Sequence, residues 1–213
     1  IKNKMNSFIE IIRAGINTTF QDNGRDNLYH IGIPFSGVMD TRNYKLSNSL
    51  LGNKINNPVI EFAYQGPLIR YKGDKINFVI TGDVIFKLIK KNIEIYGNCY
   101  ENYILEDEDQ LDIISTNKSV YGYLSFSGEF DLKFQWGSCS INTKANIGSN
   151  EGKKLQNNQK INILNINSNQ IKKKLDYLNT RIEKIRVIKG TNFDYFSNEG
   201  KKIFFEKEFT VSK

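Results

Sequence analysis

The chain has 213 residues, of which 39% are hydrophobic and 12% aromatic, enough apolar material for a folded core in one domain or two small ones. The formal net charge is +7, but the lysines are scattered apart from residues 172–174, which fits small anionic substrates better than nucleic acid. Two distant cysteines and one histidine exclude a disulfide framework and a histidine-rich metal site. No apolar run has the roughly 18 residues of a membrane helix, so we expect a cytoplasmic protein that binds neither nucleic acid nor membrane.

The N-terminal part predicts one strand and one long loop. Residues 8–12 are rich in β-forming side chains, which is typical of a strand. Residues 15–37 contain many turn-forming residues but no regular period, and loops of this length are usually functional or disordered. Phe20, Leu28 and Phe35 make this loop too apolar for disorder, so we expect an ordered loop that packs on the core.

A helix and a series of short strands follow. Asp40 is a favourable N-cap, apolar residues recur at helical spacing up to residue 51, and Gly52 tolerates the left-handed conformation that ends helices. The segments beyond the helix are short, rich in β-forming residues and separated by turn signals, which predicts a barrel or sandwich. The predicted strands are residues 59–63, 67–72, 76–81, 84–89, 92–96, 103–105, 111–114, 120–126 and 161–166.

The C-terminal part predicts a second unit that begins but does not finish. Polar residues dominate 169–184, which predicts a linker or a surface helix. Beyond it we expect a strand at 185–188, a short helix at 193–199 and a further strand at 204–211. The predicted organisation is an N-terminal domain at 5–168, the linker at 169–184 and the beginning of a second domain at 185–213.

Residues 18–83 carry a series of motifs in a regular order. TTFQDNGR begins at Thr18, GIPFSGVMD ends at Asp40, SNSLLGN ends at Asn53, VIEFAYQGP contains Glu61, and TGD begins at Thr81. In order and spacing they resemble the "TTxQDxGR", "GVPxSGAMD", "ANxLVGN", "xLExxxxGP" and "TGA" motifs of one family. This is the biotin-dependent carboxyltransferase subunit family, which includes the C-type subunit of 5-oxoprolinase, the second subunit of allophanate hydrolase and an antagonist of a kinase inhibitor.

Later motifs match this family less closely. Glu129 stands at the second glycine of "AYLAVAGG", Cys139 replaces the arginine of "LGSRST", and Lys153 belongs to a reduced form of "GRxLxxGDxL". Residues 186–211 resemble the "LRVLPGPQxDxF…FTVS" segment, so the resemblance spans nearly the whole chain and corresponds to the N-terminal two-thirds of a family member. Nothing near Cys139 marks an activated thiolate.

The resemblance implies a mainly β fold: a cyclophilin-like β-barrel with one or two short helices, plus the start of a second barrel. It implies an enzyme subunit that acts on a small amide together with a related cyclophilin-like partner subunit and possibly a third subunit. The first implied function is the C-type subunit of an ATP-dependent 5-oxoprolinase, which opens the ring of 5-oxoproline to glutamate, with ATP bound through the complex.

Two alternatives stay open. One is a carboxyltransferase subunit that moves CO2 to urea or a similar amide from carboxybiotin carried on another chain. The other is a noncatalytic regulatory module that sequesters its partner, which the departures at Glu129, Cys139 and Lys153 favour.

The candidate catalytic residues are Asp22, Arg25, His30 and Glu61. Arg25 has a planar fork that can clamp a carboxylate or phosphate, and Asp22 could orient it or transfer a proton, but the two could equally hold the loop as an internal pair. His30 has the only unperturbed pKa near neutrality, yet a single histidine in a packed loop is more often structural. Glu61 lies in an apolar strand, where a carboxylate is costly unless paired, so we expect a pair with Arg25 or His30.

The candidate substrate-binding residues are less specific. Ser36 and Gly37 could expose backbone N–H groups to an oxyanion or form a plain tight turn, and Asp40 is more often a helix cap than a catalyst. Thr81 and Gly82 could line the same cleft or form a β-bulge. The full set is Gln21, Gly24, Ser36, Gly37, Asp40, Asn48, Thr81 and Gly82, and no metal site is expected.

Overall fold

The computed structural model describes residues 6–167, 169, 173–175 and 186–210. The chain divides into two compact units, residues 1–177 and 178–213, and each is considered by itself. The first unit consists of two antiparallel sheets with few helices, which confirms the mainly β prediction. None of the described helices has the length and apolar character needed to cross a membrane.

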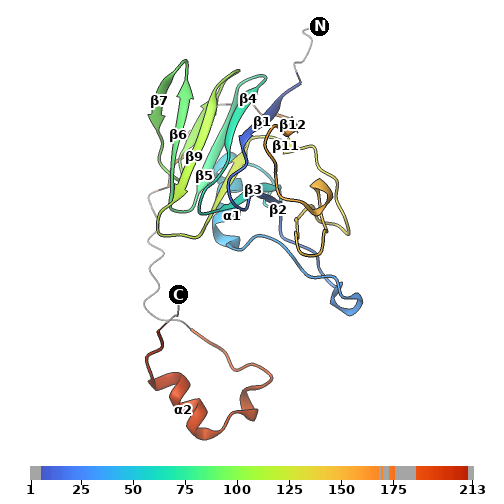
Figure 1. The fold of residues 1–213 in the computed structure, drawn as a ribbon, viewed down its shortest axis with the longest axis vertical. Coiled ribbons are helices and arrows are strands. Elements are labelled where there is room, and N and C mark those ends of the chain that lie inside the picture. The colour runs from blue at the N-terminus through green and yellow to red at the C-terminus, as the bar shows by residue number, and fades with distance from the viewer. Residues whose placement is uncertain (1–5, 168, 170–172, 176–185, 211–213) are drawn as a thin grey trace. The chain divides into compact units, whose positions relative to one another are not determined.

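The larger sheet has seven strands and joins both ends of the first unit (Figure 1). β1 pairs with β12 on one side, with Ile9 opposite Ile161, and with β4 on the other. The first strand of the chain is therefore held inside the sheet, between two partners, and not at its edge. The order is β11 (Glu129–Phe130), β12 (Lys160–Leu164), β1 (Phe8–Arg13), β4 (Leu68–Lys72), β9 (Gln110–Thr116), β6 (Val84–Lys90) and β7 (Ile93–Tyr96).

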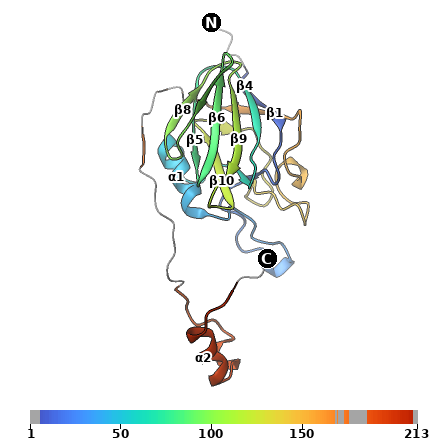
Figure 2. The ribbon, with the colours of Figure 1, turned by 60° about the vertical axis from the view of Figure 1, so that its left-hand side comes forward.

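The smaller sheet has five strands and carries the helix α1 (Thr41–Leu51), which contacts β5 and β10 (Figure 2). Its order is β2 (Thr19–Gln21), β3 (Val59–Ala63), β10 (Tyr121–Phe126), β5 (Ile76–Thr81) and β8 (Asn102–Leu105). Every residue of β3 and β5 is buried. Strands of this kind read as continuous apolar runs because both faces of the sheet are covered.

The ends of α1 follow from its sequence. The Asp40 carboxylate accepts a hydrogen bond from Asn43 N at 3.0 Å, and Gly52 ends the helix in the left-handed conformation with φ of 69°. These local signals confirm the predicted helix and its N-cap.

One apolar cluster fills the space between the two sheets. Phe78 of β5 is fully buried in it. Its ring centroid lies 5.7 Å from that of Tyr103, 6.3 Å from that of Phe86 and 6.4 Å from that of Phe126. Aromatic rings at these separations add attraction beyond the area they bury, so Phe78 is a central contact of the core.

The sequence patterns missed short strands. β2 lies within the predicted loop at 15–37, and β11 was not expected. A strand of two or three residues has no measurable alternation, and both strands exist because longer neighbours, β3 and β12, offer pairing partners.

The second unit differs from its prediction. Its described residues contain a 3-10 helix, η3 (Phe193–Tyr195), and α2 (Asn198–Glu206), so the predicted strand at 204–211 is wrong over residues 204–206. Ser197 accepts a hydrogen bond from Gly200 N at 3.1 Å, and this N-cap starts a helix that carries the β-forming phenylalanines along.

Three C-terminal predictions remain. Residues 186–190 form no strand, so the predicted strand at 185–188 is wrong in its described part. The predicted linker at 169–184 lies outside the described residues, apart from 169 and 173–175. That residues 185–213 begin a second barrel stays a prediction.

Replacing Phe78 with alanine should lower the free energy of unfolding by about 3–5 kcal/mol, because it removes a fully buried ring and leaves a cavity. Ile85→Ala is the matched control, since Ile85 is 45% exposed and should cost less than about 1 kcal/mol. Urea unfolding followed by circular dichroism measures both. Equal losses would contradict the assignment of Phe78 to the core.

Candidate functional site

Asp22 ties the long loop to residues 138–140. Its Oδ1 accepts hydrogen bonds from Ser138 Oγ at 2.5 Å, Ser140 Oγ at 2.6 Å and Gly24 N at 2.9 Å. Its Oδ2 accepts a further bond from Cys139 N at 2.8 Å. Burial raises the pKa of the Asp22 carboxyl, but the bonds from the two hydroxyls and the two N–H groups outweigh burial and hold the pKa below its usual value. This geometry supports a role in holding the loop.

Arg25 grips the same segment from the carbonyl side. The side chain is 1% exposed. Its Nη2 donates to Ser140 O at 2.8 Å and its Nε donates to Gln135 O at 3.1 Å. Its Nη1 is enclosed without a partner among the described residues, and burial lowers the pKa of the guanidinium. The planar fork is therefore spent mainly on backbone carbonyls, and the described residues show no ion pair between Asp22 and Arg25.

Two stretches of the loop approach each other closely. Arg25 N donates to Phe35 O at 2.7 Å and Val38 N to Asp22 O at 3.1 Å. Gly24 has φ of 90°, and a Cβ atom at this position would lie 1.8 Å from Ser36 O, so only glycine fits. Within the described part of the chain, the N–H groups of Ser36 and Gly37 donate to no acceptor, as the first of the two interpretations of this turn requires.

Glu61 sits at the junction of this loop with α1. Its Oε2 accepts hydrogen bonds from Met39 N and from the Tyr123 hydroxyl, each at 2.8 Å. The predicted pair with Arg25 or His30 is therefore wrong. A tyrosine and a backbone N–H take the place of a charged partner, because β10 puts Tyr123 directly opposite Glu61.

Glu61 differs from Asp22 in its unused bonding capacity. Glu61 Oε1 accepts no hydrogen bond from the described residues, and it is not among the enclosed atoms that lack a partner. Burial raises the pKa of Glu61, Asp40 raises it further, and the two hydrogen bonds offset only part of this. Glu61 is thus a carboxyl that holds a proton more tightly than usual and keeps one oxygen open.

Tyr123 is the residue that the sequence patterns missed. Its hydroxyl donates to Glu61 and accepts from Asp40 N at 2.7 Å, so it fixes both the carboxyl and the start of α1. In the sequence Tyr123 is one apolar residue within a strand. The signal that could have found it is a tyrosine paired with a buried glutamate on the neighbouring strand.

Thr81 and Gly82 are joined to the start of α1 through Asn43. Thr81 Oγ1 donates to Asn43 O at 2.9 Å. The Tyr100 hydroxyl accepts from Gly82 N at 3.1 Å and donates to Asn43 Oδ1 at 2.8 Å. The two predicted residues therefore help to place the helix that begins beside Glu61.

Three other candidates lie elsewhere or face inward. His30 is exposed on η1 (Tyr29–Ile31), and its side chain contacts none of the other candidates. Gln21 Nε2 donates to Ile141 O at 2.9 Å, and Asn48 Nδ2 donates to Asn57 O at 2.8 Å. Gln21 and Asn48 thus hold neighbouring backbone.

The three departures from the family motifs have separate surroundings. Cys139 is fully buried beside Asp22, and burial raises the pKa of its thiol far above the usual value. Glu129 accepts a hydrogen bond from Asn165 Nδ2 at 2.9 Å, and Lys153 pairs with Glu151 at 2.8 Å. Across the described residues, no three His, Cys, Asp or Glu side chains come together in a way that could hold a metal ion.

Residues 31–213 match the family described as carboxyltransferase domain, subdomain A and B. The chain belongs to this family. Members with known names include the C-type 5-oxoprolinase subunit of Haemophilus influenzae, which is 32% identical over 148 residues, 70% of this chain and 47% of that protein. The Escherichia coli protein of the same name is 28% identical over 73% of this chain and 49% of its own length. This chain thus spans about half the length of these relatives, less than the two-thirds expected.

Solved structures of family relatives share the fold. The crystal structure of urea amidolyase from Kluyveromyces lactis matches 76% of this chain and 10% of its own, with 27% identity and a TM-score of 0.68. A crystal structure of TTHA0988 matches 95% of this chain and 40% of its own with a TM-score of 0.79, and at 20% identity this likeness concerns the fold alone.

Replacing Asp22 with asparagine should lower the free energy of unfolding by roughly 1–3 kcal/mol at pH 7, because the new amide presents donors to groups that are themselves donors. The folded pKa of Asp22 is lowered. Its stabilisation is therefore present above the unfolded pKa of about 3.9 and is lost as the pH falls through the folded pKa. Urea unfolding between neutral and acidic pH should show the variant approaching the wild type in acid. The exposed Asp26→Asn is the control, and an equal loss there would count against the assignment.

Replacing Glu61 with glutamine should have the opposite pH dependence. The amide oxygen can still accept from Met39 N and the Tyr123 hydroxyl, while the side chain no longer ionises. Because the folded pKa is raised, the wild type loses stability as the pH rises from the unfolded pKa of about 4.3 through the folded value. Thermal unfolding should therefore find the two proteins alike in acid and the variant more stable at pH 8. A variant that is less stable at pH 8 would contradict a raised pKa.

Proposed function

We propose that this chain is the C-type subunit of an ATP-dependent 5-oxoprolinase, which opens the ring of 5-oxoproline to glutamate. The observation that carries the proposal is the junction around Glu61, where a buried carboxyl keeps one oxygen open beside the unused N–H groups of Ser36 and Gly37. Support comes from the two bacterial relatives that are named as 5-oxoprolinase subunits of this type.

Ring opening requires a proton donor, and Glu61 is suited to this task. Water adds to the ring carbonyl carbon, the bond between this carbon and the ring nitrogen breaks, and the nitrogen takes a proton to leave as an amine. A carboxyl with a raised pKa still carries a proton closer to neutral pH, and such tuning is how buried glutamates serve as general acids. The N–H groups of Ser36 and Gly37 would stabilise the negative charge that develops on the carbonyl oxygen.

ATP would bind mainly outside the described residues of this chain. The start of α1 is bordered by the carboxyl groups of Asp40 and Glu61, which would repel a phosphate group. These residues do not fit a nucleotide, and we derive no step through ATP here. The proposal therefore includes a related partner subunit and possibly a third subunit that supply the nucleotide site.

The second candidate function is a carboxyltransferase subunit for urea or a similar amide. It is favoured by the match to urea amidolyase at 27% identity in the solved structure and 29% in the Saccharomyces cerevisiae protein. Carboxybiotin would then be carried on another chain. A regulatory module that binds its partner without turnover is the third candidate, and the departures at Glu129, Cys139 and Lys153 support it.

The test uses the full-length gene co-expressed with its related subunits, and it measures ADP release with and without 5-oxoproline. We expect release that depends on 5-oxoproline and falls at least about 100-fold in Glu61→Gln, since general acid catalysis contributes roughly 10²–10⁴-fold. Glu94→Gln, on the exposed edge strand β7, is the matched control and should keep full activity.

The outcomes separate the candidates. A stable complex without 5-oxoproline stimulation would reject the 5-oxoprolinase function, and the same complex would then be assayed with urea and a biotinylated carrier protein. Stimulation that survives in Glu61→Gln would retain the function but remove Glu61 from its chemistry. A Glu61 variant that loses activity without losing the complex supports the proposed role.

A further inference from the structure

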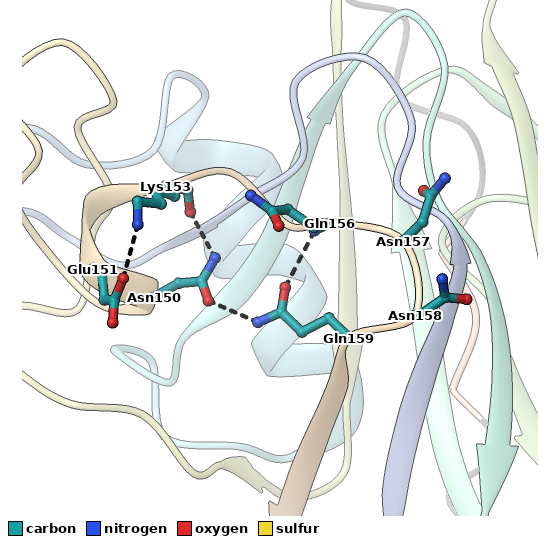
Figure 3. A pocket seen from close by; sticks show the side chains of 7 residues that line it. All are labelled: Asn150, Glu151, Lys153, Gln156, Asn157, Asn158 and Gln159. Atoms are coloured by element: carbon teal, nitrogen blue, oxygen red, sulfur yellow. Dashed lines mark hydrogen bonds and ion pairs between the residues drawn. The ribbon is translucent and has the colours of Figure 1, made fainter.

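A polar pocket lies outside the junction around Glu61 (Figure 3). Residues 150, 151, 153 and 156–159 line it, and its volume is about 370 Å³. A second pocket of about 270 Å³ adjoins it and shares Asn150, Glu151 and Gln159. Volumes of this order suit a small molecule.

Hydrogen bonds from amide side chains hold the walls of this pocket. Asn150 Nδ2 donates to Lys153 O at 2.8 Å, and Gln159 Nε2 donates to Asn150 Oδ1 at 2.7 Å. Asn157 Oδ1 accepts from Ala14 N at 2.8 Å and so ties the pocket to the end of β1. The walls are therefore fixed before any ligand arrives, which lowers the ordering cost of binding.

Other amides in the same pocket are unused. The side chains of Gln156 and Asn158 make no hydrogen bond to described residues, and Asn157 Nδ2 has no acceptor among them either. The charged residues Glu151 and Lys153 pair with each other at 2.8 Å. The free groups of the pocket are thus carboxamides, each of which offers a donor and an acceptor.

We propose that this pocket binds a small polyhydroxylated molecule of the sugar or cyclitol class. A hydroxyl both donates and accepts, so neighbouring hydroxyls match neighbouring carboxamides without a change of charge. The adjoining pocket adds the apolar side chains of Leu132 and Ile161, which suit the C–H face of such a ring. The site does not depend on the proposed function, since none of its residues takes part in the junction around Glu61.

The test titrates the ¹⁵N-labelled full chain with myo-inositol and D-glucose and follows the side-chain NH2 signals of Gln156 and Asn158. Cyclohexanol is the matched probe, because it has the ring size of inositol but a single hydroxyl. We expect saturable shifts with inositol or glucose and binding of cyclohexanol at least about tenfold weaker, equivalent to about 1.4 kcal/mol.

Variants complete the test. The double substitution Gln156→Ala and Asn158→Ala removes only exposed amides that hold no wall, so the fold should persist and binding should weaken at least about tenfold. Asn98→Ala, an amide outside this pocket, should bind as the wild type does. The proposal is overturned if neither polyol gives saturable shifts, if cyclohexanol binds equally well, or if the double variant binds unchanged.

Discussion

The first unit depends on one buried charge, the Asp22 carboxylate. A charge inside a protein is tolerated only when its lone pairs are matched by donors, and Asp22 meets this condition with four hydrogen bonds. The donors come from two segments far apart in sequence, so the carboxylate determines where the segments meet. Arg25 adds the complementary half, because it donates to the carbonyl groups of the segment whose N–H and O–H groups Asp22 accepts. Loop residues 35–38 then rest on this frame through two backbone bonds.

Two buried carboxyl groups on neighbouring elements have opposite electrostatic character. Asp22 is saturated with donors and its pKa is lowered, whereas Glu61 has two donors on one oxygen and its pKa is raised. Burial is comparable in kind at both positions, so the number of donors decides the difference. A saturated carboxylate is suited to holding structure, and a carboxyl with an open oxygen is suited to exchanging a proton. This contrast shifts the weight of the candidate site from the loop itself to its junction with α1.

Local signals were sufficient for much of the fold, and long-range contacts were needed for the rest. The cap at Asp40 and the stop at Gly52 define α1 from neighbours in sequence alone, and most longer strands are visible in their β-forming runs. The partner of Glu61 was not predictable in this way, since it follows from the pairing of β3 with β10. Neither was the fate of the Asp22 and Arg25 side chains, whose partners lie more than 100 residues away. The motifs located the candidate residues in sequence but could not distinguish structural from chemical roles among them.

The central position of β1 has a consequence for protein synthesis. β1 pairs with β12, and Asp22 bonds to residues 116–118 positions further along the chain. At a ribosomal rate of about 5–20 residues per second, these partners emerge roughly 6–24 s after the loop. During that interval the nascent loop carries a solvated carboxylate and β1 lacks one neighbour. The N-terminal motif therefore completes its structure only when most of the first unit has been made, and contacts of such long range favour slow folding.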